Sequence, residues 1–103
     1  MNEERAAIAA ELVSHLAEGT LPPDCEVVVE AIGRGHAVWF ISDGFEGWDT
    51  ERRAAETVAY LIQVRGLDFA SHDVWACDGM THAEQAALLA AGERRFERPD
   101  YAY

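Results

Sequence analysis

Three side chains that serve as zinc ligands in many proteins, His72, Cys77 and His82, recur at intervals of five residues. Zinc requires ligands that converge on one point. We predict a strand at 73–77, so His72 and Cys77 would lie at its opposite ends, roughly 15 Å apart. His82 would lie in the first turn of the next helix. The spacing therefore argues against a zinc site, and we expect neither a metal nor a cofactor.

The two cysteines are the strongest nucleophiles in the chain, and both have acidic neighbours. Cys25 lies between Asp24 and Glu26, and Cys77 precedes Asp78. A neighbouring carboxylate raises the pKa of a thiol and so disfavours the reactive thiolate. We therefore expect two separate buried thiols rather than a nucleophile or a disulfide.

Other catalytic signals are weak. Nineteen acidic residues allow many carboxylate pairs, so no particular pair is indicated as a general acid and base. The glycines at 33 and 35 resemble a hairpin turn and lack the helix start that a phosphate-binding loop requires. The sequence predicts no catalytic residue; a small Cys/His enzyme or metal protein remains a lesser alternative.

The loop at 43–49 is the most unusual segment. It combines two aromatic side chains with three carboxylates: Asp43, Phe45, Glu46, Trp48 and Asp49. An aromatic plug with a polar rim is typical of protein interfaces, which makes these residues candidates for partner binding. The alternative is that both aromatic rings fold inward and cover the edge of a sheet.

A second acidic group is expected on the first helix, which we predict at 3–18, ending at Gly19. Its apolar stripe includes Ile8, Leu12 and Leu16. On the opposite side, acidic residues recur every seven positions and would form a row about 10.5 Å apart: Glu4, Glu11 and Glu18. We count this row among the candidate partner-binding residues.

The remaining elements predict a single α+β domain with the order α-β-β-α-β-α. Strands are predicted at 26–32 and 36–42, joined as an antiparallel hairpin by a three-residue turn at 33–35. A helix capped by Asp49 or Thr50 runs to about Arg65, with one side expected to carry Ala54, Val58, Leu61, Ile62 and Arg65. A third strand at 73–77, parallel to the second, precedes a turn at 78–79. Thr81 and Glu84 form a capping box for a last helix that stops at Gly92.

This three-stranded sheet has apolar residues on both faces. Helices on both sides would cover them, or a homodimer would bury one side.

Charge limits the function further. The eight Lys and Arg positions are all arginine, and the net charge is −11 with neutral histidines, although 50% of the residues are hydrophobic. An acidic disordered tail would lack the apolar residues, and a nucleic-acid binder would carry the opposite charge. We find no signal peptide and no membrane span, so the expected location is the cytoplasm. A positively charged protein surface is the expected partner.

In size, net charge and the absence of an enzyme motif, the chain resembles small acidic phage-encoded anti-defence proteins of the anti-CRISPR and DNA-mimic type. The resemblance implies a non-enzymatic, stoichiometric inhibitor that occludes a positively charged nucleic-acid-binding surface of a host defence complex, in the host cytoplasm. An antitoxin or immunity protein that neutralises a basic nuclease is the alternative. Acidity that serves only solubility is a further reading.

Overall fold

The computed structural model describes residues 2–91 and 101–102, and its α+β architecture confirms the predicted order of elements. The helices and strands are α1 (Asn2–Ser14), β1 (Glu26–Ile32), β2 (Gly35–Ile41), α2 (Thr50–Arg65), β3 (Val74–Met80), α3 (His82–Ala90) and β4 (Tyr101–Ala102). No helix within these residues is long and apolar enough to span a membrane.

The sheet is mixed, with the strand order β3-β2-β1-β4. β1 and β2 form the predicted antiparallel hairpin, and β3 runs parallel to β2 after the chain crosses through α2. The two-residue strand β4, which we did not predict, extends the three main strands by pairing with β1 at Val28 and Val29. β3 is longer than predicted, because Asp78 and Gly79 continue the strand instead of forming a turn.

The hairpin turn contains two residues instead of the predicted three. Ile32 pairs directly with Gly35, so only Gly33 and Arg34 lie between the strands. Gly33 has a φ of 57°, a conformation that glycine adopts without steric cost and that tight hairpin turns require. Gly35 lies under the indole of Trp75, and a Cβ added there would come within 2.5 Å of that ring.

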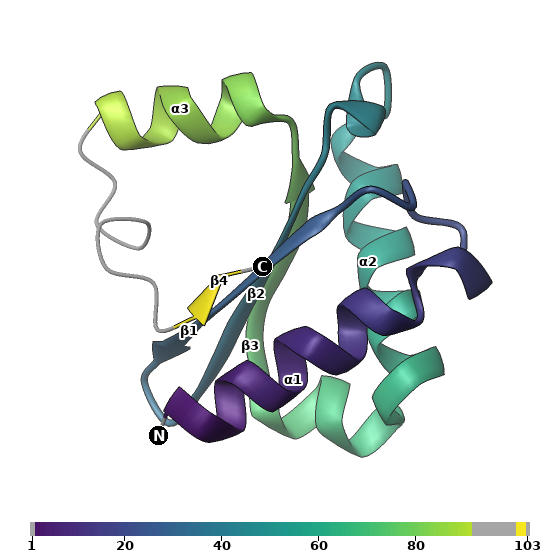
Figure 1. Ribbon diagram of the computed structural model, residues 1–103, viewed down its shortest axis with the longest axis vertical. Coiled ribbons are helices and arrows are strands. Elements are labelled where there is room, and N and C mark those ends of the chain that lie inside the picture. The colour runs from purple at the N-terminus through teal and green to yellow at the C-terminus, as the bar shows by residue number, and fades with distance from the viewer. Residues whose placement is uncertain (1, 92–100, 103) are drawn as a thin grey trace.

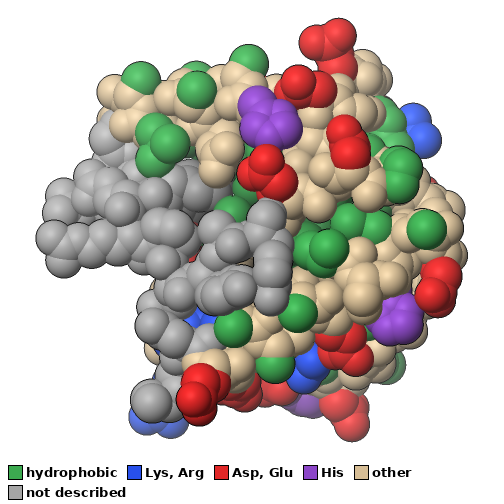
Figure 2. Space-filling model, viewed as in Figure 1, with side chains coloured by type: hydrophobic (Ala, Val, Ile, Leu, Met, Phe, Trp, Pro, Cys, Tyr) green, Lys and Arg blue, Asp and Glu red, His purple; other side chains and the backbone are tan. Residues whose placement is uncertain are grey.

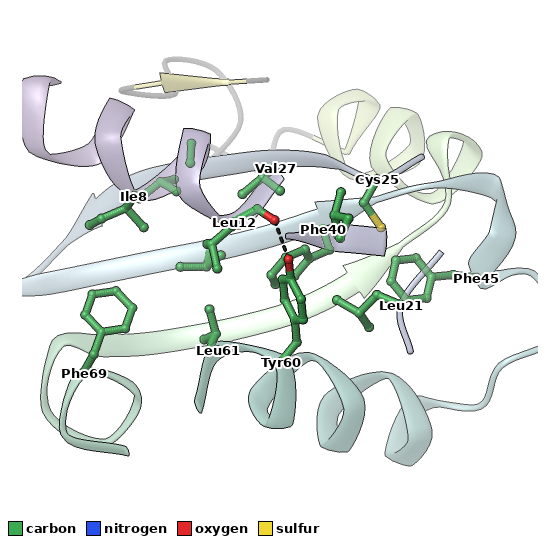
Figure 3. Close-up of a cluster of buried hydrophobic side chains, with 14 residues drawn as sticks. Ile8, Leu12, Leu21, Cys25, Val27, Phe40, Phe45, Tyr60, Leu61 and Phe69 are labelled. Atoms are coloured by element: carbon green, nitrogen blue, oxygen red, sulfur yellow. Dashed lines mark hydrogen bonds between the residues drawn. The ribbon is translucent and has the colours of Figure 1, made fainter. Parts of the chain in front are cut away.

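Helices cover the two faces of the sheet unequally. α1 and α2 lie on one face, and α3 stands on the other (Figure 1). The larger core lies under α1 and α2 and includes Leu12, Phe40 and Tyr60 (Figure 3). A smaller cluster on the other face contains Trp39 and Met80, against which Leu88 of α3 packs.

α1 ends four residues earlier than predicted. Ser14 closes the helix by donating from its hydroxyl to the Glu11 carbonyl, at 2.8 Å, and a short 3₁₀ turn follows at Leu16–Glu18. Glu18 therefore lies in this 3₁₀ turn, outside the helix that carries Glu4 and Glu11. The prediction of one helix that carries all three carboxylates is wrong.

The predicted apolar side of α2 is confirmed as buried only at Leu61. Val58 and Ile62 are 40% and 37% exposed, whereas Thr57 and Tyr60 are buried together with Leu61. The two polar residues can lie inward because their hydroxyls are satisfied. Thr57 donates to the Arg53 carbonyl at 2.7 Å, and Tyr60 donates to a carbonyl of α1. A pattern read from hydrophobicity alone therefore misses the two buried hydroxyl residues of this helix and includes two exposed apolar ones.

The end of the last helix also differs, since α3 begins at His82 and runs to Ala90. The predicted stop at Gly92 lies outside the described residues.

Candidate partner-binding surface

The structure separates the three residues that could have suggested a zinc site. Cys77 lies in the middle of β3 and packs against the main core, His72 lies in the turn before this strand, and His82 begins α3 beyond its far end. Among the described residues, no group of His, Cys, Asp and Glu side chains is arranged to hold a metal ion.

Both thiols are free; Cys25 is buried, as predicted, whereas Cys77 is only half-buried. Burial, reinforced by the charge of Asp24, raises the pKa of Cys25 to about 12. Burial also raises the pKa of Cys77 to about 12; a hydrogen bond with Thr57 opposes this rise and the charge of Asp78 adds to it. Each thiol therefore stays protonated at neutral pH.

Four acidic residues lie at the end of the sheet where β1 begins and β2 ends. We call this group, Asp24, Glu26, Asp43 and Glu46, the acidic edge. The hairpin brings it together, since Glu26 pairs with Ile41, and Ser42 donates to Asp24 at 2.5 Å. Glu46 follows in the same turn, with its N–H bonded to the Asp43 carbonyl at 3.0 Å. In Figure 2, red carboxylates surround a purple histidine in the upper part of the molecule, near α3.

His82 sits within this edge and connects three parts of the chain. Its backbone N–H donates to the Asp43 carboxylate at 3.1 Å, and its Nδ1 lies 3.1 Å from the same oxygen. Its Nε2 lies 3.3 Å from the Glu26 carboxylate. The three side chains are between 48% and 76% exposed, so water screens these contacts.

These contacts favour the charged forms of His82 and Asp43. Hydrogen bonds to Glu26 and then to Asp43 raise the pKa of His82. The backbone N–H and then the side chain of His82 lower the pKa of Asp43. Protonated His82 offsets only one of the negative charges, and the edge keeps a negative net charge.

Of the aromatic loop residues, Phe45 is fully buried, so the expectation that it is an exposed interface anchor is wrong. Trp48 is half-buried and meets the Phe45 ring edge-to-face at 5.2 Å. The guanidinium of Arg52 stacks on Trp48 at 3.6 Å, and Arg53 donates to the Phe45 carbonyl at 2.9 Å. The loop therefore follows the alternative reading, in which its aromatic rings fold inward.

The three acidic residues of the loop at 43–49 lie in two different parts of the structure. Asp43 and Glu46 belong to the acidic edge. Asp49 caps α2 by accepting from the backbone N–H of Arg52 at 2.7 Å. That bond gives Asp49 a structural role without removing its charge from the surface.

Within the part of the chain that the structure describes, Glu4, Glu11 and Glu18 make no contact with the acidic edge. Glu11 forms an ion pair with Arg65 of α2. Glu18 lies 3.1 Å from His15, and Glu4 is exposed near the beginning of α1. The structure thus divides the predicted binding residues between two regions.

A hollow of about 410 Å³ lies between α3 and the second face of the sheet. Trp39, Met80 and Leu88 supply its apolar lining. At its rim, Arg53 donates to Glu84 at 2.5 Å, which ties the first turn of α3 to α2. Because Arg53 and Glu84 already form a hydrogen bond with each other, the hollow offers a ligand mainly apolar contacts.

Sequence reasoning missed Asp24, Glu26 and His82. A two-residue hairpin turn would have placed Asp24 opposite Asp43, because residues paired in this register have numbers that add to 67. For His82 the sequence provides a weaker indication, namely that it directly follows the Thr81 helix cap. Comparisons with protein-family models, with curated proteins and with solved structures each found no match.

Proposed function

We propose that this chain is a non-enzymatic acidic binding protein. Its contact surface is the acidic edge, and its partner is a nucleic-acid-handling protein or complex whose positively charged surface it occludes. The observation that carries the proposal is the gathering of four carboxylates from separate parts of the hairpin and its following turn. Among residues 2–91 and 101–102, the only basic side chain that contacts these four residues is that of His82.

Physical chemistry favours a basic partner for such a surface. Like-signed carboxylates held close together repel one another, and a cationic partner relieves that repulsion when it binds. A net charge of −11 also attracts the partner over a distance and accelerates encounter. The raised pKa values of the Cys25 and Cys77 thiols disfavour the thiolate that covalent catalysis needs, which supports a binding role.

The test begins with capture of proteins from a lysate of the relevant host on the immobilised chain. We expect the retained proteins to include a basic, nucleic-acid-binding protein. After its purification, the association rate constant should fall at least about tenfold between ~50 and ~500 mM salt. Retention of proteins that bind no nucleic acid, or association that is insensitive to salt, would contradict the proposal.

Paired variants locate the surface. Glu26→Gln with Glu46→Gln removes two charges from the acidic edge. Glu3→Gln with Asp68→Asn removes two exposed charges elsewhere and is the matched control. We expect the first pair to slow association several-fold more than the control. Equal effects would mean that total charge matters and that the acidic edge is not the contact surface.

A further inference from the structure

The strand β3 forms an outer edge of the sheet. It pairs with β2 on one side, and no strand of the described chain lies on its other side. Residues 74–78 are partly or fully exposed, whereas all seven residues of β2 are buried. Edge strands carry unpaired backbone groups that can pair with another chain.

The direction of these backbone groups follows from one hydrogen bond. Ser42 donates to the Met80 carbonyl at 2.9 Å, so the backbone of Met80 faces β2. Alternate residues of a strand direct their backbone groups to opposite sides, and Gly79 and Cys77 therefore face outward. Gly79 is already engaged: its N–H donates to Asp78 at 2.8 Å and its carbonyl accepts from Arg53 at 3.5 Å. Within the described part of the chain, the outward groups of Cys77 are left for pairing.

Trp75 gives the same edge an apolar contact. It is 56% exposed, the second highest value among the exposed large hydrophobic residues. Its indole lies against Gly33 and Gly35, which lack the side chains that would otherwise displace it. The ring is therefore held from one side, while the residue as a whole is 56% exposed. A guanidinium or a lysine stem packs well on such a ring.

The charges on β3 indicate which kind of chain can pair with this edge. Asp73 is exposed just before the strand and Asp78 is half-exposed within it. A second copy would bring the same carboxylates, and another net charge of −11, against them. Like charges opposed across strands are destabilising, and opposite charges are stabilising. The edge therefore fits a positively charged strand better than a copy of itself.

We infer that the outer edge of β3 accepts an extended segment rich in arginine or lysine, contributed by the basic partner, as an additional strand. The inference rests on the proposed function for the sign of the partner's charge. It adds backbone pairing at Cys77 and ring contact at Trp75 to the attraction that the acidic edge supplies.

The test uses the full chain, isotopically labelled, and a defined probe. The probe is a capped peptide of alternating arginine and valine, and its control alternates glutamate and valine. Amide exchange of Cys77 should be fast in the free protein and should slow at least about tenfold with saturating arginine peptide. The Met80 amide, which faces β2, should not change, and the glutamate peptide should have no effect.

A substitution gives a second, independent measurement. Trp75→Ala should weaken binding of the arginine peptide at least about threefold. Leu67→Ala, which removes a 61% exposed side chain outside β3, should leave it unchanged. Circular dichroism shows whether each variant is folded. If Trp75→Ala unfolds, the amide exchange of Cys77 in the unsubstituted protein tests the inference by itself.

Three results would overturn the inference. Slow exchange of Cys77 in the free monomer would show that the edge is closed. Slow exchange only in a dimer, seen by sedimentation, would make a second copy the occupant. Peptide-induced changes confined to Glu26 and Asp43, with Cys77 unaffected, would exclude the β3 edge and leave the proposed function standing. The lysate experiment tests the proposed function, and the peptide experiment tests pairing at β3. Either can fail while the other succeeds, so failure of the proposed function is distinguishable from failure of the inference.

Discussion

The buried hydroxyl of Tyr60 is predicted to hold the end of α1 onto α2. It donates to the Leu12 carbonyl at 2.5 Å (Figure 3), and Leu12 belongs to the last turn of α1, where carbonyls lack partners within the helix. Tyr60→Phe removes this donor and keeps the ring, which packs edge-to-face on Phe40 with ring centroids 5.8 Å apart. The substitution therefore tests one hydrogen bond with little change in packing.

The expected loss follows from burial of the acceptor. Leu12 has no exposed surface, so water cannot replace the lost hydroxyl without rearrangement. A buried group left without a partner costs about 1–3 kcal/mol. Each kcal/mol lowers the melting temperature of a domain of this size by about 4–8 °C. Urea unfolding followed by circular dichroism and tryptophan fluorescence measures the free energy directly.

Ser14→Ala is the matched control. Its hydroxyl donates to the neighbouring carbonyl of Glu11, but Ser14 is exposed and water can take its place. We expect a change within about 0.5 kcal/mol. If Tyr60→Phe also costs less than about 0.5 kcal/mol at an unchanged denaturant slope, the hydroxyl does not stabilise the helix end and the reasoning is refuted.

Three other predictions follow from local contacts. Because the pKa of His82 is raised from 6.5, its contribution to stability is complete below about pH 6.5 and is lost as the pH rises through the raised value. The urea midpoint should show this fall, and His82→Gln should remove it; an identical pH profile for the variant would contradict the assignment. Gly79→Ala should cost about 1–3 kcal/mol in urea unfolding, since the added Cβ would lie 2.6 Å from the Phe45 ring, and an unchanged midpoint would show that the ring moves freely. Cys25 and Cys77, each with a pKa of about 12, should resist alkylation in the native protein near neutral pH and react after unfolding, as mass spectrometry can record; rapid native labelling of either would show an accessible thiolate.

Local chemistry explains which parts of the fold were predictable. Asp49 caps α2, and Thr81 and Glu84 form the complete capping box of α3, as their types and spacing indicated. β1 has its predicted bounds of Glu26–Ile32. These features depend on neighbours within a few residues, so the sequence specifies them almost directly.

The errors arose where distant segments meet. Phe45 looked like a surface anchor because it stands among acidic residues, yet its ring packs against Gly79 of β3. Asp78 and Gly79 looked like a turn, yet pairing with β2 extends the strand through them. Tertiary contacts outweigh local propensity in both places.

The candidate site shows the same division. The sequence by itself determined the excess of carboxylates, the loop that carries Asp43 and Glu46, and the helix start at which His82 lies. Only the tertiary structure decided that Glu26 and Asp43 flank His82 from two sides. The number of charges and the start of a helix are local properties. Which charges become neighbours depends on hairpin register and on the return of the chain through α2 and β3, which long-range packing sets.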